Sequence, residues 1–292
     1  LVLANARLNA HSLRKAERVG WLARPAFGGL AAVWAQSQAD ADRLRQLGAP
    51  VQGIFGNLKF DATPDAALLA RGHALRERCV AVGRPVVLLA SAREGEEAEL
   101  LAALKQFRPT AAGNPPQVAS DLIANGPVQW LIVPRHPQRF DEVEALVRQH
   151  GFSVSRRSAW GPDAEPQAAD VWLGDSMGEM PLYYGLGSVA LLGGSFAPLG
   201  GQNLIEAAAC GCPVVMGPSV FNFQEAADLA AQAGAAFAVD SMAQGVQQAV
   251  ALAQDTVRGA QVRAAAEQFA AAHRGAALRT AQAVQDLLGS RG

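Results

Sequence analysis

The chain has 292 residues, of which 50% are hydrophobic; one core rarely organises so long a chain, so two domains are expected. Its formal net charge of −1 at pH 7 excludes the strongly basic surface with which proteins bind nucleic acid, so no nucleic acid partner is expected. Cys79, Cys210 and Cys212 are interpreted as buried thiols, because no other metal-ligating residues stand near them in the sequence.

Apolar strand-like segments alternate with helix-like segments from the first residue onward. Strands are predicted within 1–8, 31–37, 51–57, 85–91, 128–134, 170–176, 188–195 and 212–217, with helices between most of them. Because the strands are continuously apolar, we expect them to be buried on both faces of a parallel sheet. The predicted fold class is therefore α/β, with doubly wound parallel sheets.

Two segments interrupt this alternation. Residues 60–65 contain the Pro and Asp residues of a linker, so a domain boundary is placed there. Residues 108–127 carry four prolines and are interpreted as a surface excursion with a short helix at 118–124. The chain opens with Leu1 and enters a strand at once, so we expect it to be cut inside a domain.

Residues that directly follow strands are the candidates for ligand binding, because ligands of open parallel sheets bind beyond the carboxyl ends of the strands. After the strand at 85–91, Ser91 and Glu94 have the spacing of a helix capping box, which leaves Arg93 to face the cleft. After the strand at 128–134, three cationic or titratable side chains follow within five positions, which favours an anion site; they are Arg135, His136 and Arg139.

The strongest local signal is the glycine-rich segment from Gly193 to Gly201, which leads into a helix that begins near Asn203. Bare backbone amides ahead of a helix bind phosphate through hydrogen bonds and the helix dipole. Glu206 lies on the first turn, where an acid is ordinarily a surface residue, but beside a phosphate it can reach a ribose. Neither the Walker spacing nor the dinucleotide G-x-G-x-x-G pattern is present.

A further turn follows the strand at 170–176. There, Asp175 or Ser176 is suited to cap a helix, and Gly178 allows close backbone approach. Taken by itself, this segment is typical of an ordinary turn.

Taken together, these motifs resemble the 3-deoxy-D-manno-octulosonic acid (Kdo) transferases. The motifs occur in chain order as NARL (from Asn5), AQSQAD (Ala35), GNLKFD (Gly56), SAREGEE (Ser91), PRHPQRF (Pro134), GDSMGEM (Gly174), GGSFAPLGGQNLIE (Gly193), FNF (Phe221) and HRGAALR (His273). The resemblance covers essentially the whole chain. One departure is Ser91-Ala92-Arg93, where the family commonly has Ser-Thr-His.

The resemblance implies a GT-B glycosyltransferase fold with two Rossmann-like domains, the first only partly present. Residues 1–62 would be the C-terminal part of the acceptor-binding domain, 63–270 the CMP-Kdo donor-binding domain, and 271–292 a C-terminal crossover helix. The implied activity moves Kdo from CMP-Kdo to a lipid A precursor in lipopolysaccharide biosynthesis, without a metal or other cofactor. The implied location is the cytoplasmic face of the inner membrane.

The resemblance also implies roles for individual residues in donor and nucleotide binding. Arg135 and the amides around Gly194, Ser195 and Gly201 would bind the CMP phosphate, Asn203 and Glu206 would hold phosphate and ribose, and Met177 with Gly178 would border the cytosine. Ser91, Arg93 and His136 complete the predicted set, and Arg93 would alter phosphate or Kdo carboxylate contacts. In the family, the general base and the membrane-anchoring segment precede the part that matches this chain, so both are expected upstream of Leu1.

Two other functions remain compatible with these residues. A GT-B transferase or 2-epimerase that uses a UDP-sugar would share the glycine-rich segment and the ribose glutamate. A non-catalytic nucleotide-binding fragment is the third interpretation.

Overall fold

The computed structural model describes residues 1–106, 128–161 and 166–289. The chain folds into two compact units, one formed by Leu1–Thr63 with Ala270–Gly292 and the other by Pro64–Phe269. The excursion and short helix predicted for 108–127 lie outside the described residues. The larger unit contains the strands that precede most of the predicted site residues.

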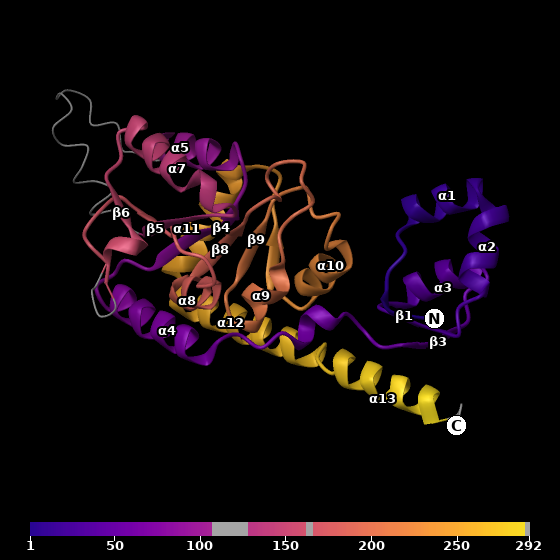
Figure 1. Ribbon diagram of the computed structural model, residues 1–292. Helices are drawn as coiled ribbons and strands as arrows, with labels where there is room; N and C mark the ends of the chain where they lie inside the picture. Colours follow the sequence, from indigo (N-terminus) through magenta and orange to yellow (C-terminus); the bar gives the residue numbers. More distant parts are fainter. Residues whose placement is uncertain (107–127, 162–165, 290–292) are drawn as a thin grey trace. The chain divides into compact units, whose positions relative to one another are not determined.

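The larger unit is built on a seven-stranded sheet in the order β10-β9-β8-β4-β5-β7-β6, and its neighbouring strands are parallel (Figure 1). The strands are β4 (Val86–Ala92), β5 (Gln129–Pro134), β6 (Val154–Arg156), β7 (Val171–Leu173), β8 (Val189–Leu192), β9 (Val214–Met216) and β10 (Ala236–Ala238). The helices are α4 (Ala66–Ala81), α5 (Glu96–Gln106), α7 (Phe140–Gln149), α8 (Met180–Leu186), α9 (Leu204–Ala209), α10 (Gln224–Gln232), α11 (Met242–Gln254) and α12 (Thr256–Ala272), with short 3-10 turns η3 (Pro137–Arg139) and η4 (Arg157–Ala159).

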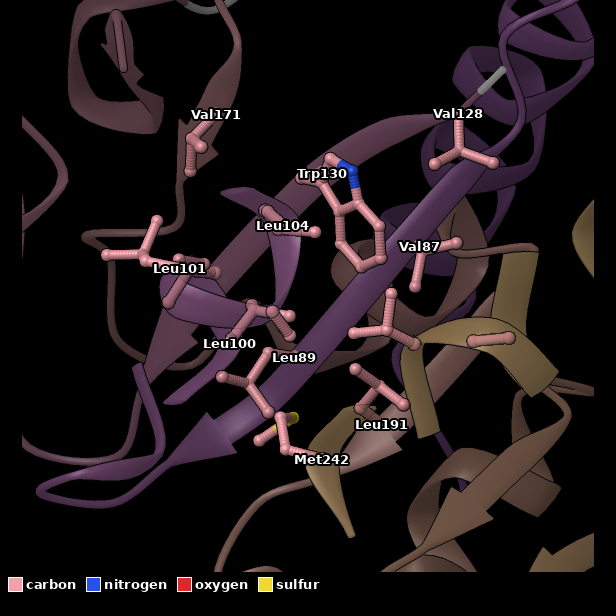
Figure 2. Close-up of a cluster of buried hydrophobic side chains, with 14 of the residues drawn as sticks. Val87, Leu89, Leu100, Leu101, Leu104, Val128, Trp130, Val171, Leu191 and Met242 are labelled. Carbon is pink, nitrogen blue, oxygen red and sulfur yellow. The ribbon is translucent and has the colours of Figure 1, made fainter. Parts of the chain in front are cut away.

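Helices cover both faces of this sheet, which is why its strands are apolar on both sides. Alternate residues of β4, such as Val87 and Leu89, join α5 and α11 in one large cluster of buried side chains (Figure 2). α4 and α8 pack against each other and against β4. The predicted α/β, doubly wound fold is confirmed for this unit.

Two strands of this sheet were not predicted, β6 and β10. Each has three residues and lies at an edge of the sheet. Only one residue of each strand is fully buried. β6 has the sequence Val-Ser-Arg, which carries no apolar run, and β10 is Ala-Phe-Ala, which is apolar but dominated by alanine, a residue depleted in strands.

The smaller unit contains a three-stranded parallel sheet in the order β1-β2-β3. Its elements are β1 (Val2–Ala6), α1 (Ala10–Arg18), α2 (Gly20–Gly28), β2 (Ala32–Ala35), α3 (Gln38–Gln46), β3 (Val51–Ile54), the 3-10 turn η1 (Leu58–Asp61) and α13 (Ala276–Gly289). Apolar residues of the sheet, α1 and α3 form a core of their own, including Val33 and Leu44.

The C-terminal helix α13 is attached to the segment after β3. Asp61 accepts hydrogen bonds from the amides of Gly275 and Ala277, the latter at 2.6 Å, and so caps the helix N-terminus. Arg279 donates to the Phe55 carbonyl oxygen at 2.7 Å, and the ring of Phe60 stacks on His273. The motifs around Gly56 and His273 therefore meet within one unit.

Candidate functional site

The candidate site lies at the carboxyl edge of the seven-stranded sheet, around the ends of β4 and β8. β4 is the first strand of this unit, and the chain then builds outward through β5 on one side before it returns to β8 on the other. Such a reversal of strand order is where open α/β sheets bind ligands. Ser91 lies near the end of β4 and the other predicted site residues follow β4, β5, β7 or β8, so the fold brings them to one edge.

The end of β4 departs from regular strand geometry at Ser91. Its φ is +55°, a conformation that residues other than glycine rarely adopt, and it sits at a shift in the register between β4 and β5. The Ser91 hydroxyl lies 3.9 Å from the Met180 sulfur. The predicted capping box of Ser91 with Glu94 is wrong, because the acid that caps this turn is Glu96, which accepts from the Arg93 amide at 2.9 Å.

Glu96 is the main residue that sequence analysis missed. It is 1% exposed, and its carboxylate also accepts hydrogen bonds from Gly194 (2.8 Å), Phe196 (3.0 Å) and Ala197 (3.2 Å), all through backbone amides. A single carboxylate thus joins the turn after β4 to the loop after β8. The pair of adjacent acids at the start of a predicted helix was the available signal, but nothing in the sequence shows a contact across 98 positions.

The amides of the glycine-rich segment point mainly into the protein. Besides the Gly194 amide, which Glu96 holds, the Ser195 amide donates to Leu192 at 3.3 Å and the Gly201 amide donates to Gly194 at 2.8 Å. The Ser195 side chain is buried and accepts from the Gly217 amide at 2.8 Å. The residues lie where the sequence predicts them, but in this structure these three amides already have acceptors.

Asn203 and Glu206 lie at the start of α9. The Asn203 side chain caps the helix by accepting from the Ile205 amide at 3.2 Å, and it donates to the Glu206 carboxylate at 3.0 Å. Glu206 is exposed. The predicted helix start at Asn203 is confirmed, and its polar side chains open to solvent at the same edge as the end of β8.

Two cationic side chains line the junction between β4 and β5. The Arg135 amide donates to the Ala92 carbonyl at 2.9 Å, which places Arg135 next to Arg93 along the edge. A Cβ atom at Gly194 would lie 3.7 Å from the Arg93 side chain, so Arg93 passes beside the glycine-rich segment. Arg135 and His136 are exposed. These cations lie at the edge where an anionic ligand would approach.

Arg139 does not join the anion site that the sequence predicts. It donates to the buried Glu97 at 2.6 Å and to Glu142 at 3.1 Å. Burial raises the pKa of Glu97, although the ion pair with Arg139 works in the opposite direction. Arg139 therefore neutralises an internal acid.

The turn after β7 is held by acids that contact the segment after β6. Asp175 accepts from the Ser158 amide at 2.8 Å and from Arg156 at 2.6 Å, rather than capping α8. Burial alone would raise the pKa of Asp175, but these hydrogen bonds outweigh it, so the pKa is lowered. Met177 is 59% exposed and Gly178 has a φ of +80°. This turn presents an apolar side chain and bare backbone at the edge.

Together, these residues form an edge with two arginines, Arg93 and Arg135, a half-buried amide at Asn203 beside the exposed carboxylate of Glu206, and an apolar side chain at Met177. Such a set suits a phosphorylated ligand with a polar sugar and a flat base. Among the described residues, no group of three or more His, Cys, Asp or Glu side chains is placed to hold a metal ion.

Comparison with known proteins agrees with the sequence motifs. The family profile described as 3-deoxy-D-manno-octulosonic-acid transferase (kdotransferase) matches residues 1–62. A 3-deoxy-D-manno-octulosonic acid transferase of Bordetella pertussis is 43% identical over 99% of this chain, and the one of Haemophilus influenzae is 33% identical over 85%. The chain spans 64% and 55% of these two relatives, respectively.

One solved structure supports the same family, and a second shares the fold. The C-terminal CMP-Kdo binding domain of WaaA from Acinetobacter baumannii superimposes with a TM-score of 0.58 at 30% identity, covering 70% of this chain and 98% of that domain. HepE of Anabaena, solved with UDP, has a TM-score of 0.57 at 18% identity over 99% of this chain and 72% of that one, which shows the shared GT-B fold. This chain covers 98% of the Acinetobacter baumannii domain and is 30% identical to it, so the chain belongs to the Kdo transferase family.

Proposed function

We propose that this chain supplies the donor half of a transferase that moves Kdo from CMP-Kdo to a lipid A precursor. Support comes from the match to nearly the whole CMP-Kdo binding domain of Acinetobacter baumannii WaaA. In this proposal, the unit Pro64–Phe269 binds the donor. Residues 1–62 belong to the acceptor-binding domain, and α13 (Ala276–Gly289) is the crossover helix.

The observation that carries the proposal is the pair of arginines, Arg93 and Arg135, at the switch point of the sheet. When the bond between Kdo and CMP breaks, negative charge grows on the departing phosphate, and fixed cations stabilise it. Because the amides of Gly194, Ser195 and Gly201 have protein acceptors, we assign the phosphate chiefly to these arginines.

The remaining predicted residues take the sugar and base of the nucleotide. Asn203 and Glu206 form a hydrogen-bonded polar pair that suits the ribose hydroxyls. Met177 is exposed and borders Gly178, so an apolar contact and bare backbone are available to the cytosine. Ser91 and His136 flank the two arginines. None of these roles needs a metal.

The test is calorimetric titration of this chain with CMP and, separately, UMP. We expect saturable binding that favours CMP. Arg135→Ala should weaken CMP binding roughly 10- to 100-fold, because it removes a charge-assisted contact, and Glu206→Ala should weaken it through the ribose. Arg148→Ala, an exposed arginine on α7 paired with Glu144, is the matched control and should leave the affinity unchanged.

The alternatives predict different titrations. Preference for UMP would support a UDP-sugar-dependent transferase or 2-epimerase. A third outcome is that this chain binds CMP but a full-length relative carrying this segment transfers no Kdo to a lipid A precursor. That outcome would support a non-catalytic nucleotide-binding fragment. Absence of binding to the folded wild-type chain would contradict the donor assignment.

We also propose that the protein works at the cytoplasmic face of the inner membrane, where its lipid acceptor would lie. No helix in the described parts of the chain is long and apolar enough to cross a bilayer. Support comes instead from the contacting helices α1 and α2. On α2, Trp21 is 80% and Leu22 is 58% exposed, and Arg14, Lys15 and Arg18 are exposed on α1. Exposed apolar residues beside basic ones suit an anionic bilayer surface.

Vesicle cosedimentation tests this contact. The chain should bind vesicles of phosphatidylglycerol and release them at high salt, whereas phosphatidylcholine vesicles should bind weakly. Replacing Trp21 and Leu22 together by Ser should abolish sedimentation, while Val257→Ser, at a 69% exposed apolar position of α12, should not. Equal sedimentation of both variants would contradict the proposal.

A further inference from the structure

Glu96 occupies the place at the switch point where the sequence alone would put a phosphate. Its carboxylate is 1% exposed and accepts four backbone hydrogen bonds, one from the turn after β4 and three from the loop after β8. A buried carboxylate is costly unless such donors satisfy it. The loop amides therefore serve an internal anion.

From these contacts we infer that Glu96 is a positioning residue for phosphate recognition, an inference that rests on the proposed function. One oxygen, Oε2, accepts from both Arg93 and Gly194. The backbone amides of Arg93 and Gly194 therefore share one acceptor atom. The Arg93 side chain then runs beside Gly194, at the edge of the site.

The same carboxylate sets the position of the polar residues further along the loop. Gly194, held by Glu96, accepts the Gly201 amide at 2.8 Å through its carbonyl, and Gly193 accepts the Gln202 amide at 2.9 Å. These two bonds fix the chain just before Asn203. Glu96 thus connects the arginine and the start of α9 through a short series of hydrogen bonds.

The Glu96→Gln variant tests this role, because it removes the charge and one of the two acceptor oxygens. The side-chain NH2 group would then face two backbone N–H donors. We expect faster hydrogen exchange at residues 194–197, and a CMP affinity at least tenfold lower than that of the wild type. Cytidine, which has no phosphate, should bind both proteins equally, as measured by ligand-observed NMR. The ratio of the two affinities reports phosphate recognition separately from general stability.

Glu97→Gln is the matched control. Glu97 is the adjacent buried acid on α5, but it accepts from Arg139, whereas the amides of Gly194, Phe196 and Ala197 donate to Glu96. This variant removes a buried carboxylate from the same helix turn and should leave both the exchange at 194–197 and the affinity ratio unchanged. Glu96→Asp keeps the charge on a shorter side chain; it should give an intermediate ratio, and it serves as the test if Glu96→Gln does not fold.

The outcomes separate this inference from the proposed function. If the wild type binds CMP and the Glu96 variants change loop exchange but not the ratio of CMP to cytidine affinity, Glu96 is merely structural and the inference is overturned. An equal fall in the ratio for Glu97→Gln would also overturn it. If the wild type does not bind CMP at all, the proposed function fails, and the inference fails with it.

Discussion

Gly193→Ala should destabilise the larger unit, because a side chain does not fit where β8 ends against β4. A Cβ atom at Gly193 would lie 2.3 Å from the Ser91 carbonyl oxygen and 2.5 Å from that of Ala90. Ordinary contact would require a shift of about 1 Å. Both obstacles are backbone atoms of a central strand, so no side-chain rotation relieves them.

The expected cost follows from two opposing effects. Overpacking of a tight core costs about 1–3 kcal/mol, and we expect the upper end because backbone must move. Replacing Gly by Ala reduces the freedom of the unfolded chain and returns about 0.4–1 kcal/mol. The net loss in the free energy of unfolding should be about 2 kcal/mol, measured by urea denaturation, and CMP binding should weaken as the end of β4 moves.

Gly187→Ala is the matched control at the other end of β8. Its Cβ atom would lie 3.4 Å or more from its neighbours, and its φ of −66° suits alanine. This variant should be as stable as the wild type or slightly more stable. Equal urea midpoints for the two variants would show that the end of β8 has room for a methyl group at Gly193 and would refute the predicted clash.

Three further predictions concern charge, thiols and the C-terminal helix. Asp175→Asn should destabilise the larger unit by roughly 1–3 kcal/mol at pH 7. Because folding lowers the pKa of Asp175, the ionised carboxylate stabilises the fold above its unfolded pKa, and this stabilisation disappears as the pH falls through the folded pKa. The urea midpoints of variant and wild type should therefore converge in acid. Burial raises the pKa of Cys210 to about 12 and that of Cys212 to about 11. Alkylation at pH 8 should therefore modify the half-buried Cys79 first, as detected by mass spectrometry. Early labelling of Cys210 or Cys212 would contradict their burial. Asp61→Ala should cost about 1 kcal/mol by removing the cap of α13, seen as faster hydrogen exchange in 276–280, and unchanged exchange would refute the capping role.

The fold class could be predicted because buried parallel strands leave a direct mark on the sequence. β4, β5 and β8 are apolar at nearly every position, since helices cover both of their faces. The short edge strand β6 has no such run, and β10 is a three-residue segment rich in alanine, so neither was predicted. The ordered motifs indicated the family, which the comparisons confirm.

The candidate site was predictable only in part. The sequence correctly predicted where the candidate site residues lie, because parallel strands present their carboxyl ends at one edge of the sheet. The sequence could not show which groups would remain available there. In the sequence, Arg139 and the loop amides are equally suited to an anion. In the structure, Glu97 pairs with Arg139 and Glu96 accepts from the Gly194 amide.

The sequence alone therefore determined the layers, the order of the strands along the chain and the edge that carries the candidate site, because hydrophobic burial acts on runs of neighbouring residues. Tertiary structure alone decided the partners of the polar groups. Glu96 reaches residues about 100 positions away, and a hydrogen bond depends on distances and angles that only the assembled sheet sets. For this protein, that assembly left Arg93 and Arg135 at the open edge.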